Sequence, residues 1–293
     1  MSGFLFLLIL DYVMRKTTKD KDTGIRWKLT TKLEDLDFAD DIALLSPNQQ
    51  LMQRKTLKLQ ELAARTGLKV STKKSKVMRI NGKSTEPIVI NGKDLDETDK
   101  FTYLGGVVTA QGGGGDDITC RIGKARTAFR KLNRIWKSSN YSIKTKVQLY
   151  SSLVKSVLLY GCETWRMNEG DARRLDIFQF TCMRRILKIR WPYVISNEDL
   201  MKRTKTKRVS TEIKTRRWKW IGHVLRMERN SHCRTALTWQ PEGKRKRGRP
   251  RTTWRRTVER ERKEMGIASW EEARNMAVDR SGWRMCVLAS CAS

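Results

Sequence analysis

The chain of 293 residues is long enough for one large domain or for two smaller domains with cores of their own. Its 62 Lys and Arg against 31 Asp and Glu give a formal net charge of +31, which indicates a polyanionic partner, either a nucleic acid or an anionic membrane surface. The six cysteines are scattered without close pairs, so the composition argues against a disulfide-stapled secreted domain and favours a reducing compartment.

The first predicted element is an apolar helix over residues 3–15, followed by a polar turn region over residues 17–28. The run over residues 4–10 is as apolar as a signal-peptide core, but no cation precedes it, Asp11 interrupts the apolar stretch and no small-residue cleavage site comes before Lys16. The run is also far shorter than the roughly 20 residues that span a bilayer. We therefore expect a buried helix in a protein that is neither secreted nor transmembrane.

An acidic pair, Asp40-Asp41, lies between two short apolar runs within residues 33–45. This pattern predicts a strand, a tight turn and a second strand. Ser46-Pro47 then begins a predicted helix that continues to about residue 65. Gly67 follows it, and glycine is the residue type that most often ends a helix.

Short strands and turns are predicted after this helix. A lysine-bearing turn and a strand are expected over residues 70–80, and the Asn-Gly pairs at residues 81–82 and 91–92 are hairpin signals. Residues 101–108 form a further predicted strand pair, with the bend at Gly105-Gly106.

The glycine run at residues 112–115 predicts a flexible joint, and we place a domain boundary there. From residue 118 to about residue 190 the chain has the periodicity of helices. The expected apolar faces are Leu149, Leu153, Val157 and Tyr160 on one helix, and Leu175, Phe178, Cys182 and Ile186 on another. A third, basic part begins near residue 191.

The acidic pair has the chemistry of a divalent-metal site. Carboxylate oxygens are hard ligands that suit Mg²⁺, and phosphoryl transfer uses metal ions to bridge the attacking and leaving oxygens. Successive strand residues point in opposite directions, so a sharp turn is needed to bring both carboxylates to one site. The alternative is a solvated surface turn, because adjacent aspartates are common on protein surfaces.

The segment from Phe38 through Ala39-Asp40-Asp41 to Leu45 closely resembles the palm motif of reverse transcriptases, which has Tyr or Phe before Ala-Asp-Asp. Further segments resemble other parts of these enzymes in the same order. The segment from Ser2 to Met14 resembles the end of the motif that contacts template and nucleotide, the segment from Gly67 to Lys76 resembles the next palm motif, and the segment from Phe101 to Gly105 resembles the primer-gripping hairpin. The segment from Tyr160 to Trp165 resembles the thumb of endonuclease-bearing non-LTR retrotransposons, and Trp218 to Met227, together with Gly248-Arg249-Pro250 and Trp254, resembles their basic tail. The chain thus resembles the carboxy-terminal part of such a reverse transcriptase.

The resemblance implies catalytic roles for residues at matching motif positions. Asp40 and Asp41 are the expected catalytic and metal-binding carboxylates, with Mg²⁺ or Mn²⁺ as the cofactor. Lys74 is the expected general acid toward the leaving pyrophosphate, and Lys73 and Lys76 are the alternatives.

The same resemblance implies contacts with substrate. Phe38 is expected beneath the primer end or the incoming nucleotide, and Tyr103, Leu104 and Gly105 are expected to position the primer. The implied partners are an RNA template and a DNA primer or target.

The chain departs from the family pattern before the acidic pair. Only 39 residues precede it, so the fingers and the palm strand that bears another metal-binding aspartate are expected to have no counterpart, and Gly3 stands where proline is commoner. Losing one well-placed group can cost on the order of 3–4 kcal/mol of catalysis. We therefore expect a reverse transcriptase fragment that is inactive alone. The alternatives are a non-catalytic nucleic-acid-binding protein or a non-functional relic.

The basic part has two features of nucleic-acid binders. Residues 118–293 carry a net charge of +28 and nine of the ten tryptophans. The residues expected to bind nucleic acid are Arg217, Lys219, Lys244, Arg245, Lys246, Arg247, Arg249 and Arg251. The segment from Lys244 to Arg251, which contains the last six of these residues, resembles an AT-hook or a nuclear localisation signal, and a solvated linker is the alternative. Of Trp218 and Trp220, one is expected to be core.

The predicted fold is α+β. Residues 1–115 are expected to form a truncated reverse-transcriptase palm of antiparallel strands and helices, residues 116–190 a helical thumb, and residues 191–293 a basic, mainly helical tail that binds nucleic acid. The expected location is nuclear or cytoplasmic.

Overall fold

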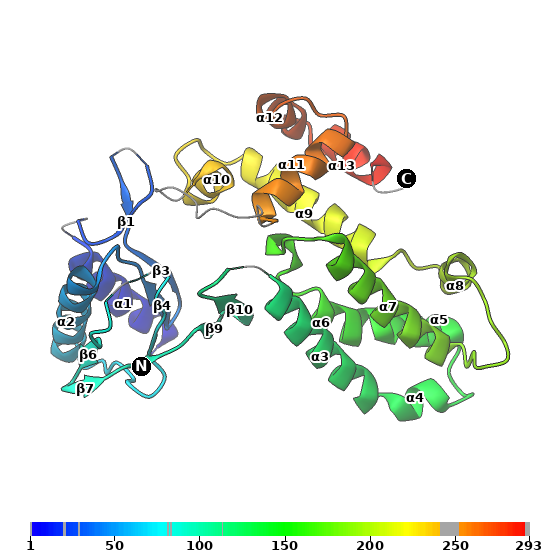
Figure 1. Ribbon diagram of the computed structural model, residues 1–293, viewed down its shortest axis with the longest axis horizontal. Helices are drawn as coiled ribbons and strands as arrows, with labels where there is room; N and C mark the ends of the chain where they lie inside the picture. Colours follow the sequence, from blue (N-terminus) through cyan, green and yellow to red (C-terminus); the bar gives the residue numbers. More distant parts are fainter. Residues whose placement is uncertain are drawn as a thin grey trace. The chain divides into compact units, whose positions relative to one another are not determined.

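The chain folds into two compact units in the computed structural model (Figure 1). The first unit comprises residues 1–112 and 238–247, and the second comprises residues 113–237 and 248–293. The division falls in the glycine run, while the second unit combines helices from both sides of residue 190. The structure describes residues 2–19, 22–28, 30–80, 82, 84–112, 114–240 and 252–290.

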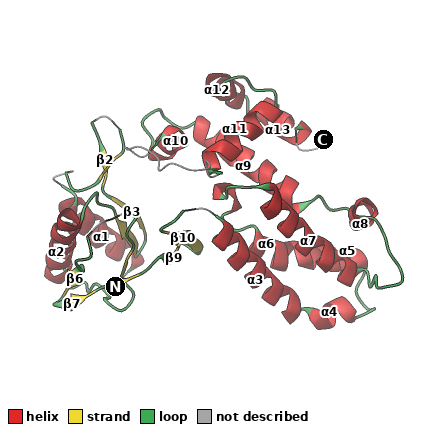
Figure 2. Ribbon diagram, viewed as in Figure 1, coloured by secondary structure: helices red, strands yellow, loops and turns green. Residues whose placement is uncertain are grey.

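The first unit pairs short strands beside two packed helices, α1 (Gly3–Thr17) and α2 (Gln49–Arg65) (Figure 2). Its strands are β1 (Ile25–Arg26), β2 (Lys32–Leu33), β3 (Asp35–Phe38), β4 (Asp41–Leu44), β5 (Lys76–Val77), β6 (Val89–Ile90), β7 (Lys93–Asp94), β8 (Asp96–Glu97), β9 (Lys100–Tyr103) and β10 (Gly106–Thr109). Consecutive strands pair antiparallel as β1–β2, β3–β4, β6–β7 and β9–β10, whereas β5 and β8 pair in parallel. The α+β fold expected from the sequence is confirmed.

Helix α1 is buried on one side only. Leu10, Val13 and Met14 pack with Leu59 of α2, but the other side leaves Phe4 69% exposed. The expectation of a buried helix is therefore wrong for the side that carries Phe4, Leu5 and Leu8. Within the described ranges, no helix combines the length and the apolar character needed to cross a bilayer.

Local sequence explains several boundaries in this unit. The Asn48 side chain accepts a hydrogen bond from the backbone N–H of Leu51 and so caps α2. Both residues of the Asn91-Gly92 turn have positive φ, at 54° and 69°, which is the turn that joins two-residue hairpins. The strand expected within residues 70–80 is limited to β5, and Asn81 lies outside the described residues.

The second unit is helical. Its elements are α3 (Gly115–Lys131), α4 (Asn133–Lys137), α5 (Ile143–Leu149), the π-helix η1 (Tyr150–Lys155), α6 (Ser156–Leu158), the 3₁₀-helix η2 (Cys162–Thr164), α7 (Glu169–Ile186), α8 (Asn197–Thr204), α9 (Val209–Leu225), α10 (His232–Thr238, which ends at the unit boundary), α11 (Trp254–Glu264), α12 (Trp270–Val278) and α13 (Arg280–Ala289). One core lies mainly among α3, the α5–η1–α6 helix and α7, and another lies among α9 and the last three helices.

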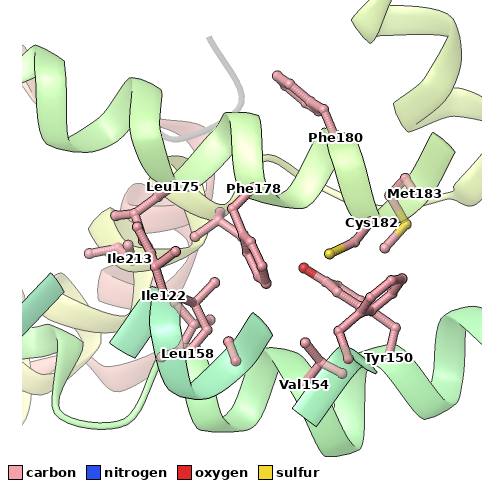
Figure 3. Close-up of a cluster of buried hydrophobic side chains, with 14 of the residues drawn as sticks. Ile122, Tyr150, Val154, Leu158, Leu175, Phe178, Phe180, Cys182, Met183 and Ile213 are labelled. Carbon is pink, nitrogen blue, oxygen red and sulfur yellow. The ribbon is translucent and has the colours of Figure 1, made fainter. Parts of the chain in front are cut away.

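One of the two predicted apolar faces is confirmed and the other is wrong. Leu175, Phe178, Cys182 and Ile186 of α7 are all buried (Figure 3 shows the first three). The buried residues of the preceding helix are instead Tyr150, Val154 and Leu158, while Leu153 and Tyr160 are exposed. The buried set is the predicted set shifted by one residue, and its spacing of four residues also fits the ordinary helical period, so periodicity alone does not choose between the two faces.

The second core depends on a close approach of two helices. Trp218 of α9 and Trp283 of α13 are both buried, and the Trp283 indole N–H donates to the backbone carbonyl of Trp218 at 3.0 Å. A Cβ at Gly222 would lie 2.1 Å from Nε1 of Trp283, so only glycine fits there. Trp218 is the core tryptophan of the 218/220 pair, as expected.

Candidate functional site

The acidic pair lies at the tip of the β3–β4 hairpin. Phe38 pairs directly with Asp41, and Ala39 and Asp40 form the two-residue turn between them. Of these two turn residues only Ala39 has a positive φ, of 53°, which is the pattern of a type II′ turn and favours glycine at that position. The strand–turn–strand prediction is confirmed, and the turn contains a residue in a costly conformation of the kind that occurs at functional sites.

The two faces of this hairpin differ in environment. Ile42 and Leu44 lie against the core formed by α1 and α2. Phe38 and Asp41 share the opposite face, where the Phe38 side chain is 65% exposed. Neither Asp40 nor Asp41 makes an ion pair or a side-chain hydrogen bond in the described part of the chain, so both carboxylates are open to a ligand.

A buried lysine from α2 holds the base of the hairpin. The Lys55 ammonium lies 2.6 Å from a carboxylate oxygen of Glu34 and donates to the backbone carbonyls of Glu34 and Leu45 at 2.7 and 2.6 Å. Glu34 directly precedes β3 and Leu45 directly follows β4, and their backbones are also bonded to each other at 2.8 Å. One side chain therefore ties both ends of the acidic hairpin to the helix behind it.

Glu34 remains a suitable partner because its charge is compensated. Burial by itself raises the pKa of the Glu34 carboxyl, but hydrogen bonds from Lys55 and from the Thr23 hydroxyl, together with the Lys55 charge, bring the pKa below its usual value. The pair is thus charged, desolvated and hydrogen-bonded. Removal of one member of such a pair leaves the other as an uncompensated buried charge.

A second hairpin approaches the acidic one. The Tyr103 hydroxyl of β9 donates to the Leu36 backbone carbonyl of β3 at 2.9 Å. Burial raises the pKa of Tyr103, and the charges of Asp37, Asp41 and Asp35 raise it further. The structure therefore brings the expected primer-positioning tyrosine to the expected catalytic hairpin.

The turn of that second hairpin is one residue earlier than predicted. Leu104 and Gly105 are the turn residues, with φ of 48° and 77°, and Gly106 already pairs with Tyr103 in β10. The bend expected at Gly105-Gly106 is wrong because two consecutive positive φ angles match the twist of a two-residue hairpin, and strand pairing fixes where they fall.

Lys74 forms no hydrogen bond or ion pair with Asp40 or Asp41 in the part of the chain that the structure describes. It is an exposed residue of the turn before β5, as is Lys73. Its expected role as general acid has no direct contact to support it.

The donor set of the hairpin fits one kind of metal. Mg²⁺ binds through one or two carboxylates, with waters and substrate phosphates supplying the other oxygens. Asp40 and Asp41 offer two such carboxylates at a surface. Among the described residues no group of three or more His, Cys, Asp or Glu is gathered into a metal site, so a ligand-rich cage of the kind Zn²⁺ prefers is not formed there.

The residues expected to bind nucleic acid differ in where the structure places them. Lys219 is exposed on α9. Arg217 is fully buried, where its guanidinium bonds to Glu261 and to the Trp165 carbonyl, so it does not fit a surface role. The remaining members, Lys244, Arg245, Lys246, Arg247, Arg249 and Arg251, lie outside the described residues.

Sequence reasoning missed Glu34 and Lys55. A signal was present, since Lys55 stands between Leu51 and Leu59 at helical spacing and so lies on the apolar side of α2. A lysine at such a position requires a buried acceptor, and Glu34 is the acidic residue directly before the predicted strand.

Three comparisons with known proteins bear on this geometry. Residues 1–108 match the family model of the reverse transcriptase (RNA-dependent DNA polymerase), and residues 128–160 match a domain of unknown function. A transposon-derived protein of Caenorhabditis elegans, itself uncharacterised, is 26% identical over 238 residues, covering 78% of this chain and 85% of the relative. No solved structure matches. The fold and these matches support a chain similar to a retroelement reverse transcriptase, with the acidic hairpin inside the matched region.

Proposed function

We propose that this chain is a reverse transcriptase fragment of an endonuclease-bearing non-LTR retrotransposon. The observation that carries the proposal is Asp40-Asp41, open and unpaired on a tight hairpin turn, inside the region that matches reverse transcriptases. Tyr103 beside that hairpin adds a second element of the same kind of site. The substrates are an RNA template and a DNA primer, in the nucleus or the cytoplasm.

Each residue near the hairpin has a role in this proposal. Asp40 and Asp41 hold Mg²⁺ or Mn²⁺, which when bound neutralises charge on the nucleotide phosphates. The exposed Phe38 ring, on the same face as Asp41, supports the primer end or the nucleotide. Tyr103, with the Leu104-Gly105 turn next to it, positions the primer, and Lys74 serves as general acid once substrate bridges the distance.

We further propose that the chain does not polymerise DNA alone. Two adjacent carboxylates are the acidic groups that this turn presents, and a two-metal centre also uses a carboxylate from a neighbouring strand. Because one well-placed group can contribute about 3–4 kcal/mol, an incomplete centre slows chemistry by a factor of hundreds or more.

The first test is primer extension by the purified chain on an RNA template with Mg²⁺ or Mn²⁺. The expected result is no extension. Extension by the unchanged chain that disappears in the Asp40→Asn variant would overturn the proposed inactivity, while it would support the proposed role of Asp40 in catalysis.

The second test asks whether the acidic turn binds metal. Mn²⁺ added to isotope-labelled chain should broaden the NMR signals of residues 36–43, and Asp40→Asn with Asp41→Asn should remove this broadening. Asp94→Asn, an exposed carboxylate on β7, is the matched control and should leave it unchanged. Equal broadening in all three chains would contradict a metal site at the turn.

A non-catalytic nucleic-acid-binding role is the second candidate. The net charge of +28 after residue 117 favours it. Binding that weakens steeply with salt, without extension, is the result that separates this role from polymerase activity.

A further inference from the structure

The second unit contains a continuous cationic groove beside α3, α4 and α7. Two adjoining cavities, of about 450 and 600 Å³, share Arg130 of α3 and Arg185 of α7 in their walls. We call their joint space the α3–α7 groove. It lies within one compact unit, far along the chain from the acidic hairpin.

The walls of this groove are cationic throughout. The basic side chains that line it are Arg126, Arg130, Lys137, Arg174, Arg185, Lys188 and Arg190, and no Asp or Glu lines either cavity. All of these side chains belong to exposed residues. Such a concentration of one charge is unfavourable unless an anion occupies the space between the cations.

Most of these cations lack a partner among the described residues, unlike others in the same unit. Apart from Arg174, none of them forms an ion pair or a side-chain hydrogen bond among the described residues. Elsewhere in the unit, Lys155 and Arg216 both bind Glu212, and Lys214 binds Glu264. Carboxylates are therefore available in the unit, yet of the groove cations only Arg174 is paired with one, Asp171 at 3.9 Å, among the described residues.

The floor of the groove is apolar and already fully packed. Phe129 and Trp136 are stacked with ring centroids 4.9 Å apart, and the Trp136 indole N–H donates to the Phe129 carbonyl at 2.7 Å. Both rings and Phe178 are almost completely buried. Their faces are not available for stacking on a base, so the groove offers charge and not an aromatic platform.

A buried lysine adds to the positive charge below one end of the groove. Lys146 donates to the carbonyls of Trp136 and Ser138 and has no carboxylate partner. Burial lowers the pKa of Lys146, and the charge of Lys188 lowers it further. An anion bound beside Lys188 would relieve this repulsion.

We propose that the α3–α7 groove binds the sugar-phosphate backbone of a nucleic acid strand. Guanidinium groups from two facing helices, Arg126 and Arg130 on one and Arg185 on the other, can each donate two hydrogen bonds to a phosphate. Lys137, Lys188 and Arg190 continue the same charge along the second cavity. The site reads phosphates and not bases, so binding is independent of sequence. This proposal rests on the proposed function only for the class of partner, a nucleic acid, and it does not require the acidic hairpin to be functional.

The test compares two triple variants of the full chain. The groove variant carries Arg126→Gln, Arg130→Gln and Arg185→Gln. The control variant carries Lys144→Gln, Lys202→Gln and Arg203→Gln, which removes the same charge from exposed sites on α5 and α8. Binding of a labelled 20-nucleotide oligothymidylate, and of a duplex of that length, is measured by fluorescence anisotropy as a function of salt.

The groove variant should bind at least about tenfold more weakly than the control variant, with a salt slope shallower by roughly 2 for the single strand or 3 for the duplex. A loss confined to one probe identifies whether a single strand or a duplex occupies the groove. A third variant with lysine at the three groove positions should retain the salt slope, which separates charge from folding. Equal affinities in the groove and control variants, on both probes, would overturn the proposal. Because no polymerase activity is measured, this outcome is separate from failure of the primer-extension test.

Discussion

The two units of this chain are stabilised in different ways. The first unit has a small core around Leu10, Val13, Met14 and Leu59, and its acidic hairpin is anchored by the buried Lys55–Glu34 ion pair. The second unit buries extended apolar clusters along its helices, and its buried ion pair, Arg217–Glu261, lies beside a tryptophan core. The residues proposed for chemistry thus lie in the unit with the smaller apolar core, where polar contacts from Lys55 and Tyr103 hold the hairpin.

The largest expected effect comes from the loss of the lysine anchor. Lys55→Ala leaves Glu34 as a buried charge without its cationic partner and with only the Thr23 hydroxyl among side chains still bonded to it, which costs about 3–5 kcal/mol. This is a large part of the roughly 5–15 kcal/mol that stabilises a typical domain. Hydrogen–deuterium exchange should become fast in residues 32–65 and stay slow in residues 169–186.

Two further variants control this comparison. Arg65→Ala breaks the exposed Arg65–Glu61 pair on the same helix and should cost less than about 1 kcal/mol. Glu261→Ala removes the partner of Arg217 and should speed exchange in α9 and α11 while leaving the first unit unchanged. If Lys55→Ala and Arg65→Ala have the same effect, the ion pair is not what holds the hairpin.

The next expected effect is a pH dependence of the first unit. The pKa of Glu34 is lowered in the folded chain, so the stability that its charge contributes is complete above the ordinary carboxyl pKa of about 4.3. That stability is lost as the pH falls through the lowered pKa of the folded state. Exchange in residues 32–45, corrected for the intrinsic rate, should therefore accelerate below about pH 4. A Glu34→Gln chain should show a weaker acceleration, and identical profiles would contradict this assignment.

The smallest expected effect concerns the turn itself. Ala39 has a φ of 53°, a region that costs most residues about 1–2 kcal/mol and glycine little. Ala39→Gly should therefore stabilise the hairpin by up to about 1 kcal/mol after the entropy cost of glycine. Ala43→Gly in β4, where no such strain exists, should destabilise it by about 0.5–1 kcal/mol. Urea unfolding of both variants tests the difference in sign.

The elements that sequence predicts well are those with local causes. The acidic hairpin follows from apolar runs around a turn, and the α7 face follows from helical period. Errors arise where distant residues decide. Arg217 stands within a basic run, yet Glu261, 44 residues later, supplies the charge that lets it be buried.

The candidate site shows the same division. The motif identifies Asp40 and Asp41, and the structure adds that Tyr103 reaches the same hairpin. The α3–α7 groove was not foreseen, because its cations come from three helices and from the segment after α7, and are unremarkable within each one. Only packing of the helices shows that these cations face a common space without carboxylates.

The π-helix at residues 150–155 affects how related chains should be aligned. A π-turn accommodates one residue more than an α-turn, so it is the structural trace of a one-residue insertion inside a helix. Deleting one residue there would return the segment to an α-helix and leave Leu158 on the same side as Tyr150, because seven α-helical steps end within about 20° of a whole number of turns. A single gap in this segment therefore marks a relative that lacks the π-turn and keeps the same helix packing.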